Sequence, residues 1–179
     1  MTVKVVAEPR YADACGSALY TTIGGRIVLA VDATGWLRPD ANCSPGRLYC
    51  HVTGHGRGQD QRVPGWSYSF IAALESGASS WAQILDAARI GPDDDPAEVT
   101  AAQLRGVIER LISTGQHHRD DPDIAVVTDA GYDVPRLFWQ LRDLPVVVGG
   151  RLRSDRVLYG RPGPWSGRAA RPNTAALSA

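Results

Sequence analysis

The chain has 179 residues, of which 44% are hydrophobic and 21% are charged, and its basic and acidic residues balance to a formal net charge of zero. This length and composition are typical of one globular domain with a packed core and exclude an intrinsically disordered chain. The zero net charge argues against nucleic-acid binding through bulk electrostatics alone.

The sequence has no apolar run near the roughly 18 residues that a membrane-spanning helix needs. The N-terminus also lacks the basic, apolar and small-residue order of a signal peptide. We therefore expect a cytoplasmic protein without a membrane partner.

Residues 1–25 show no sustained periodicity and are expected to form a leader with one short helix around 11–19. The run 26–31 is short, β-branched and apolar on both faces, which predicts a strand buried in the middle of a sheet. This strand is expected to stop at Asp32, because the residues from 34 to 40 have turn chemistry.

Two more strands are predicted at 48–53 and at 66–74, the second beginning after Pro64 and Gly65. The segment 81–90 has helical propensity, yet Pro92 and an acidic run cut it short. Its periodicity alone does not decide between helix and strand.

The clearest helix begins at Pro96 with Asp95 as its N-cap, has apolar residues at three- and four-residue intervals up to Ile112, and ends at Gly115. The polar connection after it contains His117 and His118, which are expected to be exposed to solvent.

A second buried strand at 124–127 leads to Asp129, and a third apolar strand is predicted at 146–148. Between them, a helix from about 135 to 141 is expected to turn three apolar side chains inward, those of Leu137, Phe138 and Leu141.

The cysteines are odd in number and form no C-x-x-C pair, so reduced thiols are expected instead of disulfides. Cys43, Cys50, His51 and His55 lie close together, but their spacing matches no zinc-finger pattern. Buried thiols and strand histidines are the better interpretation.

Asp32 and Asp129 each follow a predicted buried strand. If these strands are parallel neighbours, the two carboxylates converge at one edge of the sheet, where like-charge repulsion favours a bound cation. Mg²⁺ prefers such oxygen ligands, and paired acids of this kind suit phosphoryl transfer. The alternative interpretation is that each Asp is an ordinary turn or N-cap residue.

The surrounding sequence closely resembles the catalytic domains of actinobacterial DDE-type insertion-sequence transposases. The similarity is colinear and extends from about Gly25 to Gly163. Five segments carry it, namely Ile27–Ala41, Leu48–Val52, Val63–Glu75, Thr128–Leu137 and Gly150–Arg156.

The resemblance implies an α/β fold, a ribonuclease H-like mixed sheet with flanking helices, as a partial catalytic domain over 26–160. It places Asp32 on the first strand and Asp129 on the fourth, and it makes 81–90 the third strand. In such enzymes the two aspartates and a downstream glutamate hold two Mg²⁺ or Mn²⁺ ions and cut and join DNA ends. The implied partners are transposon ends and target DNA in the bacterial nucleoid, and intact relatives allow a homodimer.

The chain departs from this family pattern at both ends. No Asp or Glu follows Asp155, so the third acid is missing, and 1–25 is too short for a DNA-end-binding region. The segment 161–179 resembles nothing in the family and is expected to be disordered. We therefore expect a transposase truncated at its C-terminal side that is inactive on its own.

Two other functions remain open. The first is a catalytically dead remnant that acts only as a DNA-binding or structural module. The second is an aspartate-nucleophile phosphatase, which needs another Asp two residues after Asp32, where Thr34 stands.

Some basic and aromatic residues have two open roles. Arg151, Arg153 and Arg156 either approach the DNA backbone or form a solvated strand edge. Trp36 and Trp66 are expected to pack between strands or in the core more than to stack on bases.

Overall fold

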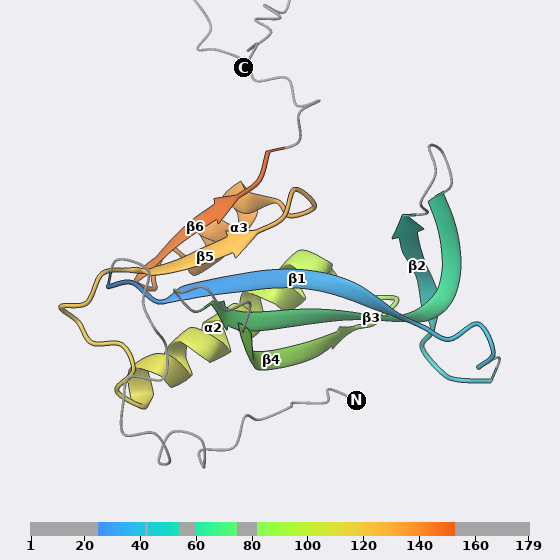
Figure 1. The fold of residues 1–179 in the computed structure, drawn as a ribbon, viewed down its shortest axis with the longest axis horizontal. Helices are drawn as coiled ribbons and strands as arrows, with labels where there is room; N and C mark the ends of the chain where they lie inside the picture. The colour runs from blue at the N-terminus through green and yellow to red at the C-terminus, as the bar shows by residue number, and fades with distance from the viewer. Residues whose placement is uncertain (1–24, 42, 54–59, 75–81, 153–179) are drawn as a thin grey trace, which may run out of the picture.

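The computed structural model describes residues 25–41, 43–53, 60–74 and 82–152. These residues contain six strands and two helices, which Figure 1 colours along the chain. In order, the elements are β1 (Val28–Leu37), β2 (Leu48–Thr53), β3 (Asp60–Leu74), β4 (Ala82–Ile90), α2 (Pro96–Ser113), β5 (Ile124–Thr128), α3 (Val134–Leu141) and β6 (Val146–Gly150). The helix predicted at 11–19 and the tail at 161–179 lie outside the described residues.

All six strands belong to one mixed sheet with the order β2-β3-β1-β5-β6, and β4 pairs with the C-terminal half of β3. The pairs β1–β3, β2–β3 and β3–β4 are antiparallel, whereas β1–β5 and β5–β6 are parallel. This topology confirms the predicted fold class, a ribonuclease H-like mixed sheet with flanking helices.

The core lies between the sheet and the helices. Successive side chains of a strand point to opposite faces, so Leu29 and Val31 of β1 share a face with their neighbours Ala73 and Ile71 on β3. All four are buried at 3% exposure or less. They pack with the apolar stripe of α2 and with two leucines of α3 in one hydrophobic cluster.

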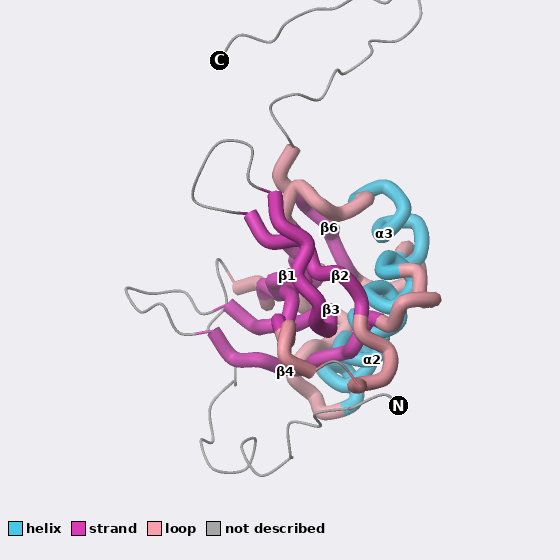
Figure 2. The backbone as a smooth tube through the Cα atoms, turned by 90° about the vertical axis from the view of Figure 1, so that its right-hand side faces the viewer, coloured by secondary structure: helices cyan, strands magenta, loops and turns pink. Residues whose placement is uncertain are grey.

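Both helices cover the same face of the sheet (Figure 2). The start of α2 agrees with the prediction, because the side chain of Asp95 accepts a hydrogen bond from the backbone N–H of Ala97 at 2.9 Å and Pro96 occupies the first turn. The end agrees too, since Gly115 has a φ of 70° just after the helix.

The strand β1 is longer than predicted. It continues through Asp32 to Leu37, because residues from Asp32 to Leu37 pair one by one with Phe70 to Gly65 of β3. The prediction that the strand stops at Asp32 is therefore wrong, and the turn predicted at 34–40 occurs only in its last part, at Pro39 and Asp40. Cross-strand hydrogen bonds to β3 outweigh the local turn preference of Gly35.

The strand β3 also begins earlier than predicted, at Asp60, and passes through Pro64 and Gly65. Pro64 pairs with Tyr49 of β2, and its carbonyl accepts a hydrogen bond from the N–H of Arg38 at 2.8 Å. Proline is tolerated here because the pairing of β3 with β1 ends at Gly65, so the missing N–H of Pro64 removes no bond of that ladder. This part of β3 bends toward β2 (Figure 1).

The ambiguous segment 81–90 forms the strand β4 over Ala82–Ile90, as the family resemblance implies. Pairing with β3 overrides its helical propensity, and the register shifts between Ile71 and Ala72.

Two smaller predictions are wrong. Phe138 is 50% exposed, and only Leu137 and Leu141 of α3 are buried. His117 is buried at 5% exposure, with its Nε2 3.2 Å from the carbonyl oxygen of Pro122, whereas His118 is exposed as expected.

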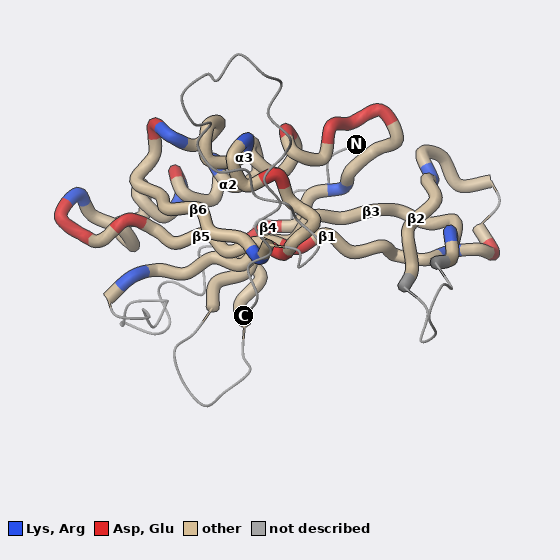
Figure 3. Tube along the Cα trace, turned by 90° about the horizontal axis from the view of Figure 1, so that it is seen from above, with Lys and Arg blue, Asp and Glu red and all other residues tan. Residues whose placement is uncertain are grey.

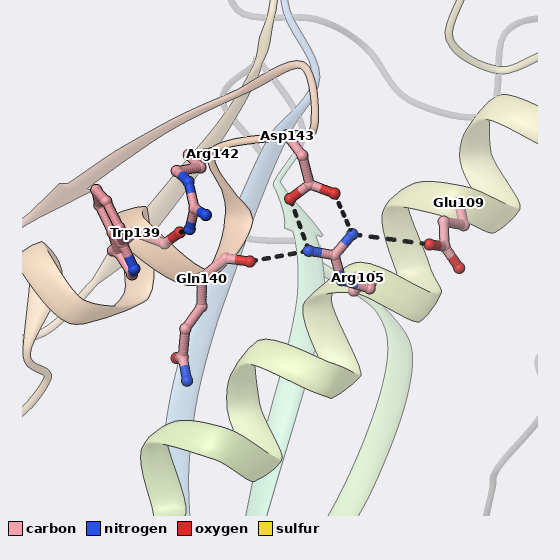
Figure 4. Close-up of polar contacts among 6 residues, drawn as sticks. All are labelled: Arg105, Glu109, Trp139, Gln140, Arg142 and Asp143. Atoms are coloured by element: carbon pink, nitrogen blue, oxygen red, sulfur yellow. Dashed lines mark hydrogen bonds and ion pairs between the residues drawn. The ribbon is translucent and has the colours of Figure 1, made fainter.

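An arginine clamp joins α2 to the turn after α3 (Figure 4). The guanidinium of Arg105 donates to both carboxylate oxygens of Asp143 at 2.7 Å and to the carbonyl oxygen of Gln140 at 2.8 Å. This paired geometry holds the helix that precedes β5 against the helix that follows it.

The clamp predicts an acid-dependent contribution to stability. Hydrogen bonding to Arg105 lowers the pKa of Asp143 from 3.8 to about 2. A carboxylate with a lowered pKa in the folded state stabilises above its unfolded pKa, and this contribution is lost as the pH falls through the folded value. Asp143→Asn should therefore lower the melting temperature at neutral pH. The difference in melting temperature between the parent and Asp143→Asn should disappear as the pH falls from about 4 to about 2. A difference that does not change with pH would contradict the clamp.

Candidate functional site

Asp32 and Asp129 come from neighbouring parallel strands. The register pairs Val28–Val31 of β1 with Ala125–Thr128 of β5, and the two acids are the next residue on each chain. Adjacent strands lie about 4.8 Å apart, so the two residues are lateral neighbours in the sheet. The strand β5 ends here while β1 continues, so Asp32 lies where β1 loses its neighbour on that side.

One oxygen of each carboxylate is held by the backbone. Asp32 Oδ1 accepts a hydrogen bond from the N–H of Ala33, and Asp129 Oδ1 accepts one from the N–H of Gly131, both at 2.9 Å. Both side chains are exposed. These bonds orient the two carboxylates.

The two acids line the same cavity, which has a volume of about 410 Å³. Its walls are formed by β1, the last residue of β4, the first turn of α2 and the turn 129–133. Two more acids line it, Asp95 and Asp133. The carboxyl ends of parallel strands are the usual place for a binding site in such sheets.

The two additional acids, Asp95 and Asp133, already have hydrogen-bond partners, because both cap helices and both accept a hydrogen bond from Arg136. Asp95 caps α2 and accepts a hydrogen bond from Arg136 Nη2 at 2.7 Å, and this contact lowers its pKa. Asp133 accepts a hydrogen bond from the backbone N–H of Arg136 at 3.2 Å as the N-cap of α3. Arg136 thus joins the starts of both helices beside the cavity and offsets part of its negative charge.

The donor set at this edge suits a hard divalent cation. Asp32 and Asp129 provide carboxylate oxygens, which Mg²⁺ accepts while its other positions hold waters and phosphates. No group of three or more His, Cys, Asp or Glu able to hold a metal ion occurs in the described parts of the chain. The site therefore offers two acidic ligands of the three that the family resemblance implies.

Tyr132 fixes the turn that follows Asp129. Burial raises its pKa to about 12, the negative charges of Asp32 and Asp129 add to the rise, and the hydroxyls of Ser69 and Thr100 partly offset it. The hydroxyl of Tyr132 is buried near the hydroxyls of Ser69 and Thr100, but it forms no hydrogen bond with either of them. The neutral phenol packs against the hydrophobic cluster, so the turn is anchored to β3 and α2.

A second cavity, of about 400 Å³, lies between β4 and α2. Its buried acid, Asp86, lies 3.9 Å from the guanidinium of Arg110 on the adjacent helix. This acid has its own cationic neighbour, and the cavity contains neither Asp32 nor Asp129.

The other residues noted in the sequence agree only partly with their predicted positions. Arg151 is exposed directly after β6, and its N–H donates to the carbonyl oxygen of Thr128 at 3.2 Å, which brings it near the acid pair. Arg153 and Arg156 lie outside the described residues. Cys50 is buried, as expected, but Cys43 is exposed, so the prediction of a buried thiol is wrong there.

The roles of Tyr132 and Arg136 were not found from the sequence. Each depends on contacts with elements far away in the chain, and only the N-cap pattern at Asp95 gave a local signal. The charged residues gather in loops and around the helices, whereas the strands carry few charges (Figure 3). No helix in the described ranges is long and apolar enough to cross a membrane.

Comparison with known proteins gives one family. A family model described as DDE superfamily endonuclease matches residues 15–178. Neither the curated proteins nor the solved structures give a significant match to the chain.

Proposed function

The chain belongs to the DDE superfamily endonucleases, and from this premise we propose that Asp32 and Asp129 are the first two acids of a DNA-cleaving site of the transposase type. Membership of this family implies DNA as the substrate and divalent ions as the usual cofactor.

The observation that supports the proposal is the register of β1 and β5. Val31 is the partner of Thr128, so the next residues, Asp32 within β1 and Asp129 just after β5, are neighbours. Two carboxylates at such a separation repel each other unless a cation lies between them. A phosphatase is less well supported, because Thr34 occupies the position where its second acid is needed.

We propose Mg²⁺ or Mn²⁺ as the ion, and Asp32 and Asp129 are the residues that would hold it. When bound, such an ion neutralises the acid pair and stabilises the charge that develops on a DNA phosphodiester. The residues of the chain hold the ion and shape the cavity, and the anchored turn at Tyr132 keeps Asp129 beside Asp32.

Cleavage by this chain alone is not part of the proposal. The resemblance implies a third acid, and the two other acids of the cavity, Asp95 and Asp133, are taken by Arg136 and by helix caps. The second candidate function, a DNA-binding module without catalysis, is therefore retained.

The test is Mn²⁺ binding by the purified chain, measured by calorimetry and by the loss of the free Mn²⁺ resonance signal. Asp32→Asn and Asp129→Asn should each weaken binding at least about tenfold, since even indirect ligand partners contribute 10- to 100-fold. Asp123→Asn, which changes an exposed acid just before β5, is the matched control and should bind as the parent does. Equal binding by all four proteins would refute the acid-pair assignment.

Incubation with supercoiled plasmid and Mn²⁺ separates the two candidate functions. Nicking that disappears in Asp129→Asn identifies an active endonuclease. Metal binding and DNA binding without nicking identify a binding module.

A further inference from the structure

Beyond Asp32, which also lines the cavity beside the first turn of α2, one face of the sheet is not covered by a described helix. Because side chains alternate along β1, Leu29 and Val31 point to the helices, and Asp32, Thr34 and Trp36 follow the opposite alternation. Figure 2 shows α2 and α3 on one side of the strands only.

Aromatic side chains occupy this face beyond Asp32. The cross-strand partners of Asp32, Thr34 and Trp36 on β3 are Phe70, Tyr68 and Trp66. We name the four rings, Trp36, Trp66, Tyr68 and Phe70, the aromatic row. Ring centroids are 6.4 Å apart for Trp36 and Trp66, 6.2 Å for Trp36 and Tyr68, and 6.2 Å for Tyr68 and Phe70.

The rings of the aromatic row pack across the β1–β3 pair, as expected for Trp36 and Trp66. Trp36 is nevertheless not buried by these contacts. Trp36 meets Trp66 at 71° and Tyr68 at 45°, so neither neighbour stacks flat on it. The residue remains 58% exposed. A large exposed indole within a row of rings is typical of a binding surface.

A fixed cation lies beside the row. The guanidinium of Arg89 is 5.6 Å from the ring of Trp66, and its Nη2 donates to the carbonyl oxygens of Pro45 at 3.1 Å and Gly46 at 2.6 Å. These contacts keep a positive charge at the surface next to the aromatic rings, where it complements a phosphate group.

We infer that the aromatic row binds unpaired nucleotides of the DNA substrate by base stacking, in continuity with the acid pair. The inference rests on the proposed function, because Asp32 and the row lie on the same two paired strands. The bases of a duplex are already stacked on each other, whereas an unpaired base has a free face for an indole. The row therefore favours DNA that is locally open next to the acids.

The experiment measures binding of a fluorescein-labelled strand of about 12 thymidines, a length within the range of single-strand sites. Anisotropy is recorded in EDTA, alongside a fully paired duplex of the same length. Trp36→Ala should weaken single-strand binding about tenfold and duplex binding much less, in line with the usual contribution of one stacked base. Trp36→Phe should retain most of the affinity.

The matched control is Trp139→Ala. Trp139 is 64% exposed on α3 and also has an arginine over its ring, Arg142 at 4.0 Å, but it lies on a helix and not in the row. This variant should bind the strand as the parent does. Equal losses for Trp36→Ala and Trp139→Ala, or equal losses on single strand and duplex, would overturn the inference. So would self-association that depends on Trp36 in a chain that binds no single strand.

Failure of this inference and failure of the proposed function can be told apart. The binding assay contains EDTA, so it does not depend on a cation at Asp32 and Asp129. Weak Mn²⁺ binding insensitive to Asp32→Asn would remove the acid-pair assignment and leave the Trp36 result intact.

Discussion

Leu104→Ala is expected to lower the free energy of unfolding by about 3 kcal/mol, within the usual 2–5 kcal/mol for a buried leucine. Leu104 is fully buried on α2 and belongs to the cluster that packs this helix on the sheet. The truncation loses apolar contacts and leaves a cavity inside the hydrophobic cluster that the hydrogen-bonded sheet cannot close. The urea midpoint at unchanged slope measures the loss.

The control for this prediction is Ile112→Ala on the same helix. Ile112 is 41% exposed, so its truncation removes less buried surface, and alanine is the better helix former at both positions. Its effect should stay below about 1 kcal/mol. Similar losses for both variants would mean that α2 does not pack as described.

Gly65→Ala is expected to destabilise the chain by about 3 kcal/mol, at the upper end for an overpacked site. A Cβ at this position would overlap the carbonyl oxygen of Trp36 and lie 3.0 Å from the Cα of Leu37. Both neighbours are backbone atoms of β1, so a rotamer change cannot relieve the clash. Only separation of the paired strands can do so, and this also disturbs the contact between Trp36 and Trp66.

Gly106→Ala provides a control of opposite sign. Gly106 lies inside α2, and a Cβ there would meet nothing within 4 Å. Alanine should stabilise the helix by up to about 1 kcal/mol. If Gly65→Ala were as stable as Gly106→Ala, the close approach of Gly65 on β3 to the backbone of Trp36 on β1 would be incorrect.

Elements with strong local signals could be predicted from the sequence. The helix α2 has an N-cap, a proline in its first turn, an apolar stripe and a terminal glycine, all set by near neighbours. The apolar runs that became β5 and β6 are equally local, and their predicted positions were confirmed.

Elements decided by distant partners could not be predicted in this way. The extension of β1 past Asp32 depends on pairing with β3, and Gly35 alone indicates a turn. The strand β4 has helical propensity and is a strand because Ser67–Leu74 provides its partner. Only the family resemblance indicated the correct structure there.

The candidate site divides in the same way. Two acids after apolar strands are visible in the sequence, and the register places them side by side. The anchoring of their turn by Tyr132 and the capture of Asp95 by Arg136 join residues from three or more elements. No local pattern encodes such contacts.

The parallel pairing of β1 with β5 has a consequence for the order of assembly. The two strands are separated by three other strands and a long helix, so their union requires closure of a large loop. Contacts of such long range generally form late and slowly. A nascent or partly unfolded chain therefore does not present both acids together, and any ion that prefers the joined pair shifts the equilibrium toward the complete domain.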